Sequence, residues 1–261
     1  MKYIETTRKD NICNICGTTE IPHLSWDHVP PKGGLDLSDM EIRNYTNSFN
    51  PEGKERDVCQ NGLKFRTICK SCNNELGTRY DDCFNTLMKD VKQIITSTII
   101  LTPIIKVKTF PTKIIKAVLW HLLASKTSKC DSPIDKITRE YLFDEKAILT
   151  NDIHLYYWFY PFDCTIIRHN VNQLNPFKLS NEYYSVLKSF PLGFAISYGE
   201  PLEILCNLTK YNTNNFQKER DIPLVISSQY PMDYPEQLRY SGVQLISDKS
   251  NDVFAIRKLK K

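Results

Sequence analysis

Two C-x-x-C pairs constrain this 261-residue chain more than any other feature of its sequence. Cys13 and Cys16 form the first pair, Cys69 and Cys72 form the second, and 52 residues lie between the two pairs. Two thiolates at this spacing fit one edge of a tetrahedral metal ion, so two pairs supply a full ligand set for zinc. Because four thiolates leave no open coordination position, such a zinc would be structural and would stabilise a small N-terminal head.

The nine cysteines are interpreted as thiols rather than disulfides. The charged start of the chain is not followed by the apolar run of a signal peptide. The longest apolar stretch, 94–105, contains Thr, Ser and Pro103 and is too short to span a bilayer. We therefore expect a cytoplasmic protein that does not enter the membrane, in which paired cysteines bind metal.

Residue types suited to hydrolysis lie between the two pairs and directly after the second. Asp27 and His28 are adjacent, so on a strand their side chains point to opposite faces. Imidazole titrates near neutral pH and can take a proton from water, whereas a carboxylate binds a hard cation. Asn73 follows Cys72, and its amide oxygen also suits Mg²⁺. A zinc ion that joined the two pairs would also set the distance between Asp27 and Asn73.

The order of these motifs resembles the HNH endonucleases that carry a zinc knuckle. After the first pair, over about residues 10–90, the chain has Asp27-His28-Val29-Pro30-Pro31-Lys32 and then Cys69-Lys70-Ser71-Cys72-Asn73. The resemblance implies a ββα-metal site in which His28 is the general base that activates water for attack on phosphorus. It also implies that Asp27 and Asn73 hold one divalent cation, Mg²⁺ or Mn²⁺, which stabilises charge on the phosphoryl and leaving oxygens. Asn73 stands where many members have the final His, as in the HNN-type variants.

The central Asn of the family motif has no match at the usual offset, where this chain has Lys64. Asn61 lies three residues earlier and is the alternative that would orient His28 through its backbone. Lys32 and Arg66 are candidates for phosphate contact, although a lone basic residue is more often simply solvated.

Hydrophobic patterning predicts an α+β chain with a treble-clef-like ββα-metal head, a helical middle and a β-rich C-terminal region. We divide it into residues 1–95, an HNH-type nuclease domain with structural zinc, and 96–261, an α+β domain. The second domain would grip substrate, form oligomers or regulate the nuclease. The apolar content of 41% is enough for a sizeable core and excludes a wholly disordered chain.

Helices are predicted at 71–93, 114–125 and 132–143, the last with Ser132 as N-cap and Pro133 at its first position. A further helix is suggested at 181–189, and 36–62 is predicted to be a long polar loop. The 99–110 segment is predicted to be extended. Strands are expected at 154–160, 165–169, 193–198, 202–208, 224–227, 243–247 and 253–257. In the first helix, Asp81 and Asp82 are interpreted as surface charges, and His121 as a core or boundary histidine.

Together the motifs predict a metal-dependent endonuclease acting on nucleic acid, DNA before RNA. Family members with unrecognised tails often serve in antiviral defence or mobile elements. The resemblance therefore implies such a role for this chain. It also implies that a regulatory protein partner or a homo-oligomer could be involved. The segment 85–130 has eight Lys and one acid, a net of +7, which suits either a polyanion partner or a solvated face. The alternative function is a non-catalytic zinc-containing module that binds nucleic acid or another protein, in which Asp27, His28 and Asn73 are ordinary turn, loop and helix-start residues.

Overall fold

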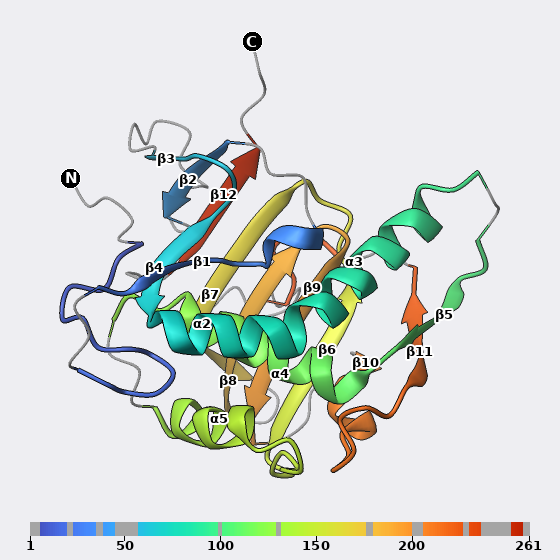
Figure 1. The fold of residues 1–261 in the computed structure, drawn as a ribbon. Helices are drawn as coiled ribbons and strands as arrows, with labels where there is room; N and C mark the ends of the chain where they lie inside the picture. Colours follow the sequence, from blue (N-terminus) through green and yellow to red (C-terminus); the bar gives the residue numbers. More distant parts are fainter. Residues whose placement is uncertain are drawn as a thin grey trace.

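The computed structural model describes residues 6–19, 23–34, 39–44, 57–98, 101–128, 132–175, 180–199, 206–226, 230–235 and 252–257. They form an α+β fold in which helices cover one face of a large antiparallel sheet (Figure 1). The strand order of this sheet is β10-β6-β9-β8-β7-β12-β2-β3. Its strands are β2 (Met40–Asn44), β3 (Asp57–Cys59), β6 (Ile153–Phe159), β7 (Cys164–Asn175), β8 (Ser180–Ser189), β9 (Leu192–Tyr198), β10 (Cys206–Asn207) and β12 (Val253–Arg257).

A separate two-stranded hairpin carries the predicted catalytic motif. Strands β1 (Ser25–His28) and β4 (Lys64–Ile68) are antiparallel, and helix α2 (Lys70–Leu76) follows β4. A π-helical turn, Gly77–Asp81, joins α2 to α3 (Asp82–Ile95). The head therefore has the strand, strand, helix order that a ββα unit requires. A third sheet pairs β5 (Ile104–Thr109) with β11 (Arg220–Val225).

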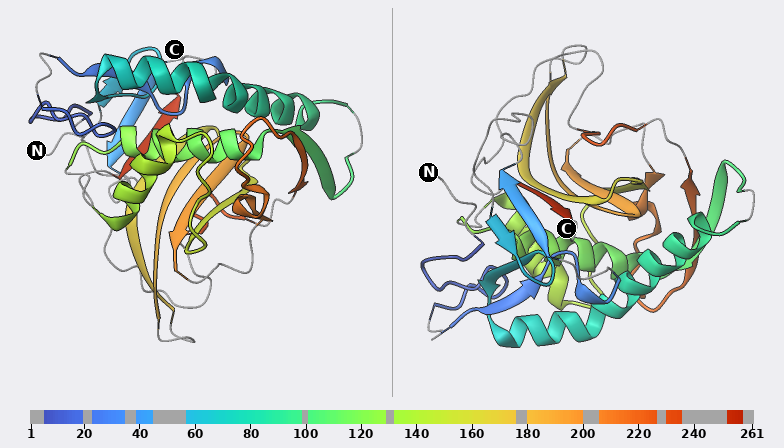
Figure 2. Two further views of the ribbon diagram at one scale, coloured as in Figure 1. Left: turned by 60° about the horizontal axis from the view of Figure 1, so that its bottom comes forward. Right: turned by 90° about the horizontal axis from the view of Figure 1, so that it is seen from above.

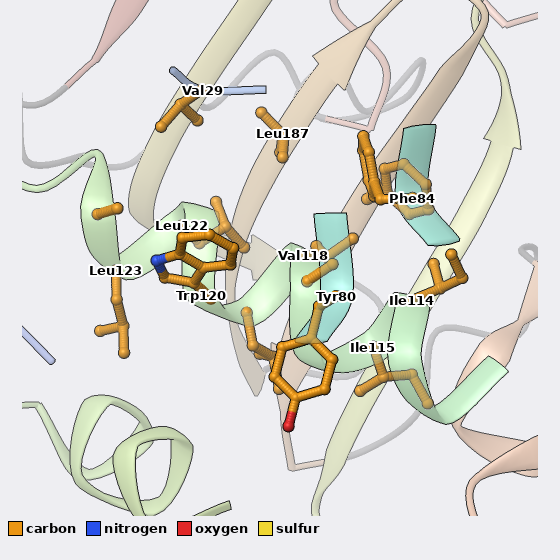
Figure 3. Close-up of a cluster of buried hydrophobic side chains, with 14 of the residues drawn as sticks. Val29, Tyr80, Phe84, Ile114, Ile115, Val118, Trp120, Leu122, Leu123 and Leu187 are labelled. Atoms are coloured by element: carbon orange, nitrogen blue, oxygen red, sulfur yellow. The ribbon is translucent and has the colours of Figure 1, made fainter. Parts of the chain in front are cut away.

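Helix α4 (Pro111–Ala124) lies between the α2–α3 layer and the large sheet (Figure 2). Every residue of α4 except Lys113 is buried, which explains why its sequence is apolar nearly all round. In Figure 3, side chains of α4 lie between Leu187 of the sheet and Tyr80 and Phe84 of the overlying helix. The core thus unites residues from both predicted domains, 1–95 and 96–261.

Most predicted elements are confirmed. The 71–93 helix forms with its π-helical turn beginning at Gly77, and 114–125 and 132–143 correspond to α4 and α5 (Pro133–Phe143). The extended 99–110 segment contains β5, and the strands at 154–160, 165–169, 193–198 and 253–257 form. Of the strand predicted at 202–208, residues 202–205 lie outside the described residues, Cys206–Asn207 is β10, and Leu208 begins a 3₁₀ turn. Strand β11 extends from Arg220 only to Val225. The predicted strand at 243–247 lies outside the described residues. Among the helices of the described segments, none has the length and apolar character needed to cross a bilayer.

The helix suggested at 181–189 is wrong, because this segment is strand β8. Both faces of the strand bury apolar side chains: Leu187 faces the helices, whereas Tyr184 and Val186 pack on the opposite face. Apolar residues on both faces remove the simple alternation that marks a half-buried strand, so periodicity alone could not separate strand from helix.

The long loop predicted at 36–62 is also wrong in part. Met40–Asn44 is strand β2, which pairs with β12 from the far end of the chain and with β3. Ile42 is buried in the main core. Pairing with a strand more than 200 residues away in sequence leaves no local signal, so the polar composition of the segment dominated the prediction.

We predict that Ser132→Ala lowers the free energy of unfolding by about 1 kcal/mol. Ser132 accepts a hydrogen bond from the Asp135 N–H, and the Asp135 carboxylate accepts one from the Ser132 N–H, so α5 begins with a complete capping box. Chemical denaturation would measure the loss. Lys136→Ala, at an exposed position on the same helix, should change stability little, and equal losses in both variants would contradict the capping role.

Candidate active site

The four motif cysteines converge. The Sγ atoms of Cys13, Cys16, Cys69 and Cys72 lie within 4.8 Å of one another, which suits a structural zinc ion. Cys69 is the N-cap of α2, so the cluster joins the 13–16 loop to the start of the helix that carries Asn73. Three of the four thiols are buried and Cys16 is exposed.

The cluster favours negative charge on one sulfur, that of Cys13, whereas burial raises the pKa of Cys69. The Cys69 N–H donates to Cys13 Sγ (3.2 Å), and the Cys72 N–H donates to Cys69 Sγ (3.4 Å). A hydrogen bond from Cys72 is the main cause that lowers the pKa of Cys13 to about 4, and the same contact raises the pKa of Cys72. Zinc binds thiolates rather than thiols, so a thiol that ionises this readily prepares the site for metal.

His28, at the end of β1, is half-buried, and its Nε2 lies 3.1 Å from the backbone oxygen of Asn61. A carbonyl oxygen only accepts hydrogen bonds, so Nε2 carries the proton and Nδ1 is the basic nitrogen. Burial lowers the pKa of His28 below its ordinary value, and the charges of Lys64 and Lys32 lower it further. The neutral imidazole is therefore the dominant form near pH 7.

The contact with His28 depends on the backbone of Asn61. This residue has a positive φ of 59°, and Gly62 follows with φ 87°, so the chain turns tightly before β4 and presents the Asn61 carbonyl to the imidazole. Asn and Gly are the residue types that enter this conformation most readily. The Asn61-Gly62 pair was the sequence signal for this turn, whereas Lys64 at the family's usual offset pairs across the hairpin with His28.

The side chain of Asn73 links α2 to β1 through two hydrogen bonds. Its Nδ2 donates to the Trp26 carbonyl (3.0 Å) and to Ser25 Oγ (3.0 Å). These acceptors orient the amide, and its Oδ1 receives no hydrogen bond from the part of the chain that the structure describes. An uncommitted amide oxygen beside β1 fits a hard cation such as Mg²⁺.

Asp27 faces the interior, on the opposite side of β1 from His28, and is only 5% exposed. Its Oδ2 lies 3.4 Å from His121 Nδ1, an ion-pair contact that is not aligned as a hydrogen bond, since both atoms are buried without a hydrogen-bond partner. Because Oδ2 faces His121, a cation bound by Asp27 would use the other carboxylate oxygen, Oδ1. The structure thus brings His28 together with Asn61, and Asn73 together with β1, but it turns Asp27 toward α4.

Sequence reasoning missed two neighbours of Asp27. His121 is completely buried, as predicted for a core histidine, yet its Nε2 lies 3.0 Å from Asp81 Oδ1. Asp81 was expected on the helix surface, and that prediction is wrong because the π-helical turn directs its carboxylate toward α4. Burial lowers the pKa of His121, but Asp27 and Asp81 outweigh this effect and raise it to about 9. A lone histidine in an otherwise apolar helix was the only hint in the sequence.

Lys32 and Arg66, the candidates for phosphate contact, have different surroundings. Lys32 is exposed in the 3₁₀ turn Lys32–Gly34, close enough to influence His28, whereas the Nε of Arg66 donates to the Leu24 carbonyl (2.9 Å). Within 85–130, Lys116 is buried on the carbonyls of Tyr141 and Asp144, so this run of lysines is not one continuous surface.

Comparison of this chain with protein-family models, with curated proteins and with solved structures found no match. The geometry of the site and the sequence motifs are therefore the basis for assigning a function to this protein.

We predict about one zinc ion per chain, lost when Cys69 and Cys72 are both changed to Ser. Loss of zinc should also lower the melting temperature by several degrees, because the cluster holds α2 against the 13–16 loop. Metal analysis of the purified protein and thermal unfolding would measure both. Cys59→Ser, outside the cluster, should keep its zinc. A wild-type protein that contains no zinc and is unaffected by chelators would refute the site.

Proposed function

We propose that this protein is a metal-dependent endonuclease of the HNH type that hydrolyses phosphodiester bonds in nucleic acid. One observation carries the proposal: the imidazole of His28, at the end of β1, is hydrogen-bonded through Nε2 to the Asn61 carbonyl, which leaves Nδ1 as the basic nitrogen. The cysteine cluster supports it further, because it anchors the helix that presents Asn73 to the same hairpin.

In the proposed reaction, His28 Nδ1 takes a proton from a water molecule as the water oxygen attacks phosphorus. The bond from phosphorus to the 3′ oxygen breaks, which leaves a 5′ phosphate and a 3′ hydroxyl. The depressed pKa of His28 keeps the imidazole neutral and able to accept this proton at cellular pH. Lys32 and Lys64, whose charges act on His28, would attract the phosphate to the same place.

Asp27 and Asn73 are the residues that would hold Mg²⁺ or Mn²⁺, and the cation would supply charge stabilisation on the phosphoryl and leaving oxygens. We further propose DNA as the substrate, and a role in antiviral defence or mobile elements under the control of a protein partner or a second copy of the chain. These last assignments follow from the family resemblance of the motifs.

A second function is favoured by the burial of Asp27. If the contact with His121 is purely structural, the cation site lacks its carboxylate, and the head would be a zinc-containing module that binds nucleic acid or protein without cleaving it. The two functions differ in one measurable property, namely whether the protein cuts DNA when a divalent cation is present.

We expect the wild-type protein to cut plasmid DNA with Mg²⁺ or Mn²⁺ and not with EDTA. His28→Ala should reduce the cleavage rate by about 10²- to 10⁴-fold, because it removes the general base. His23→Ala is the matched control, since His23 is exposed and precedes β1. Folding of each variant should be checked by zinc content and melting temperature. Full cleavage by His28→Ala would refute the role of His28 as general base, whereas DNA binding without cleavage by the wild type would favour the binding module.

We also expect the cleavage rate to rise with pH as His28 loses its proton. Because burial and two lysines depress the pKa of His28, the midpoint of this rise should lie below about pH 6.5. Lys64→Gln removes one of the positive charges that disfavour protonated His28, so it should move the midpoint upward. Single-turnover cleavage rates, measured for both proteins over a range of pH, would test the position of the midpoint and its shift. An unshifted midpoint in Lys64→Gln would show that Lys64 does not act on the titrating group.

A further inference from the structure

We infer that His121 is a positioning residue for Asp27, held in place by Asp81, so that helix α4 is part of the cation site. The inference rests on the proposed function, because it assigns a role to the surroundings of the proposed cation ligand. Its basis is a chain of contacts from Asp27 Oδ2 to His121 Nδ1 (3.4 Å) and from His121 Nε2 to Asp81 Oδ1 (3.0 Å).

Two of these groups, Asp27 and His121, are an unusual pair to find inside a core, whereas Asp81 is 26% exposed. His121 is completely buried between Trp120, whose ring lies 4.3 Å from its own, and Phe84. Removing charged groups from water costs several kcal/mol for each ion, and well-packed apolar residues at such positions are often at least as stable. Packing alone therefore does not account for an imidazole here, whereas a need to orient Asp27 does.

Asp81, the hydrogen-bond partner of His121, lies in an irregular part of the helix. Asp81 ends the π-helical turn, whose extra residue rotates its carboxylate toward α4. Gly77 begins that turn and lies beside both groups, since a Cβ at this position would be in ordinary van der Waals contact with Asp81 Oδ2 (3.4 Å) and the Trp120 ring (3.6 Å).

In this arrangement His121 would fix the position of Asp27 Oδ2, so that Oδ1 is the oxygen that would bind the cation. Groups that orient a metal ligand commonly change metal affinity by about 10- to 100-fold when they are removed. Because α4 also packs against β8 of the large sheet, this contact makes the region beyond residue 95 necessary for a well-ordered cation site.

The test is Mn²⁺ binding to the full chain by calorimetry, together with cleavage as a function of Mg²⁺ concentration. His121→Leu should weaken Mn²⁺ binding and raise the half-maximal Mg²⁺ concentration by about 10- to 100-fold, with a smaller change in the rate at saturating Mg²⁺. His121→Gln, whose amide can donate a hydrogen bond to Asp27, should recover part of the affinity. His169→Gln is the matched control, since His169 is equally buried but contacts Ser125.

Unchanged Mn²⁺ affinity and an unchanged Mg²⁺ midpoint in a folded His121→Leu would overturn the inference. If that variant does not fold, Asp81→Asn is the second test, because Asp81 is 26% exposed and its loss should weaken Mn²⁺ binding through His121. A wild-type protein that cuts DNA while both variants bind Mn²⁺ normally would refute the positioning role alone. A wild-type protein that does not cut DNA would instead refute the proposed function.

Discussion

The convergence of four cysteines is the constraint on which the rest of the site depends. The cluster joins a loop near residue 13 to the N-cap of α2, and α2 in turn holds Asn73 against β1 through the Trp26 carbonyl and Ser25 Oγ. The relative position of hairpin and helix is therefore set by these directional contacts together with apolar packing, since Phe65, Ile68 and Leu76 are buried in the main core. A short hairpin and a seven-residue helix could not hold this geometry by themselves.

A second constraint comes from α4, which lies between the α2–α3 layer and the large sheet. Through this helix the head and the C-terminal strands share one core, and two strands from the N-terminal part, β2 and β3, extend the large sheet. The His121 contact with Asp27 belongs to the same arrangement, since it lies at the point where α4 meets the hairpin. Under the proposed function, the sheet would support the catalytic head directly instead of acting as a separate attachment.

The helices, most of the strands and the cysteine cluster could be predicted because each has a local signal. Ser132 and Pro133 mark the start of α5, and the apolar run of α4 predicts a buried helix. The strands β2 and β8 could not be predicted in the same way, since β2 owes its pairing to a partner at the other end of the chain and β8 is apolar on both faces. Within the candidate site, the motif pointed to His28 and Asn73, and Asn61 was the alternative to Lys64 at the family's usual offset. The orientation of Asp27 depended on a histidine more than 90 residues further on.

The sequence by itself determined the chemistry that is available: four thiols at metal-binding spacing, an Asp-His pair at a strand end and an asparagine at a helix start. These are properties of residue types and short spacings, which are present whatever the chain does elsewhere. Only the tertiary structure decided which groups face one another, namely that His28 meets the Asn61 carbonyl and that Asp27 meets His121 and, through it, Asp81. Those contacts join segments far apart in sequence, and they exist because the packing of α4 against the hairpin and the π-helical turn brings the segments together.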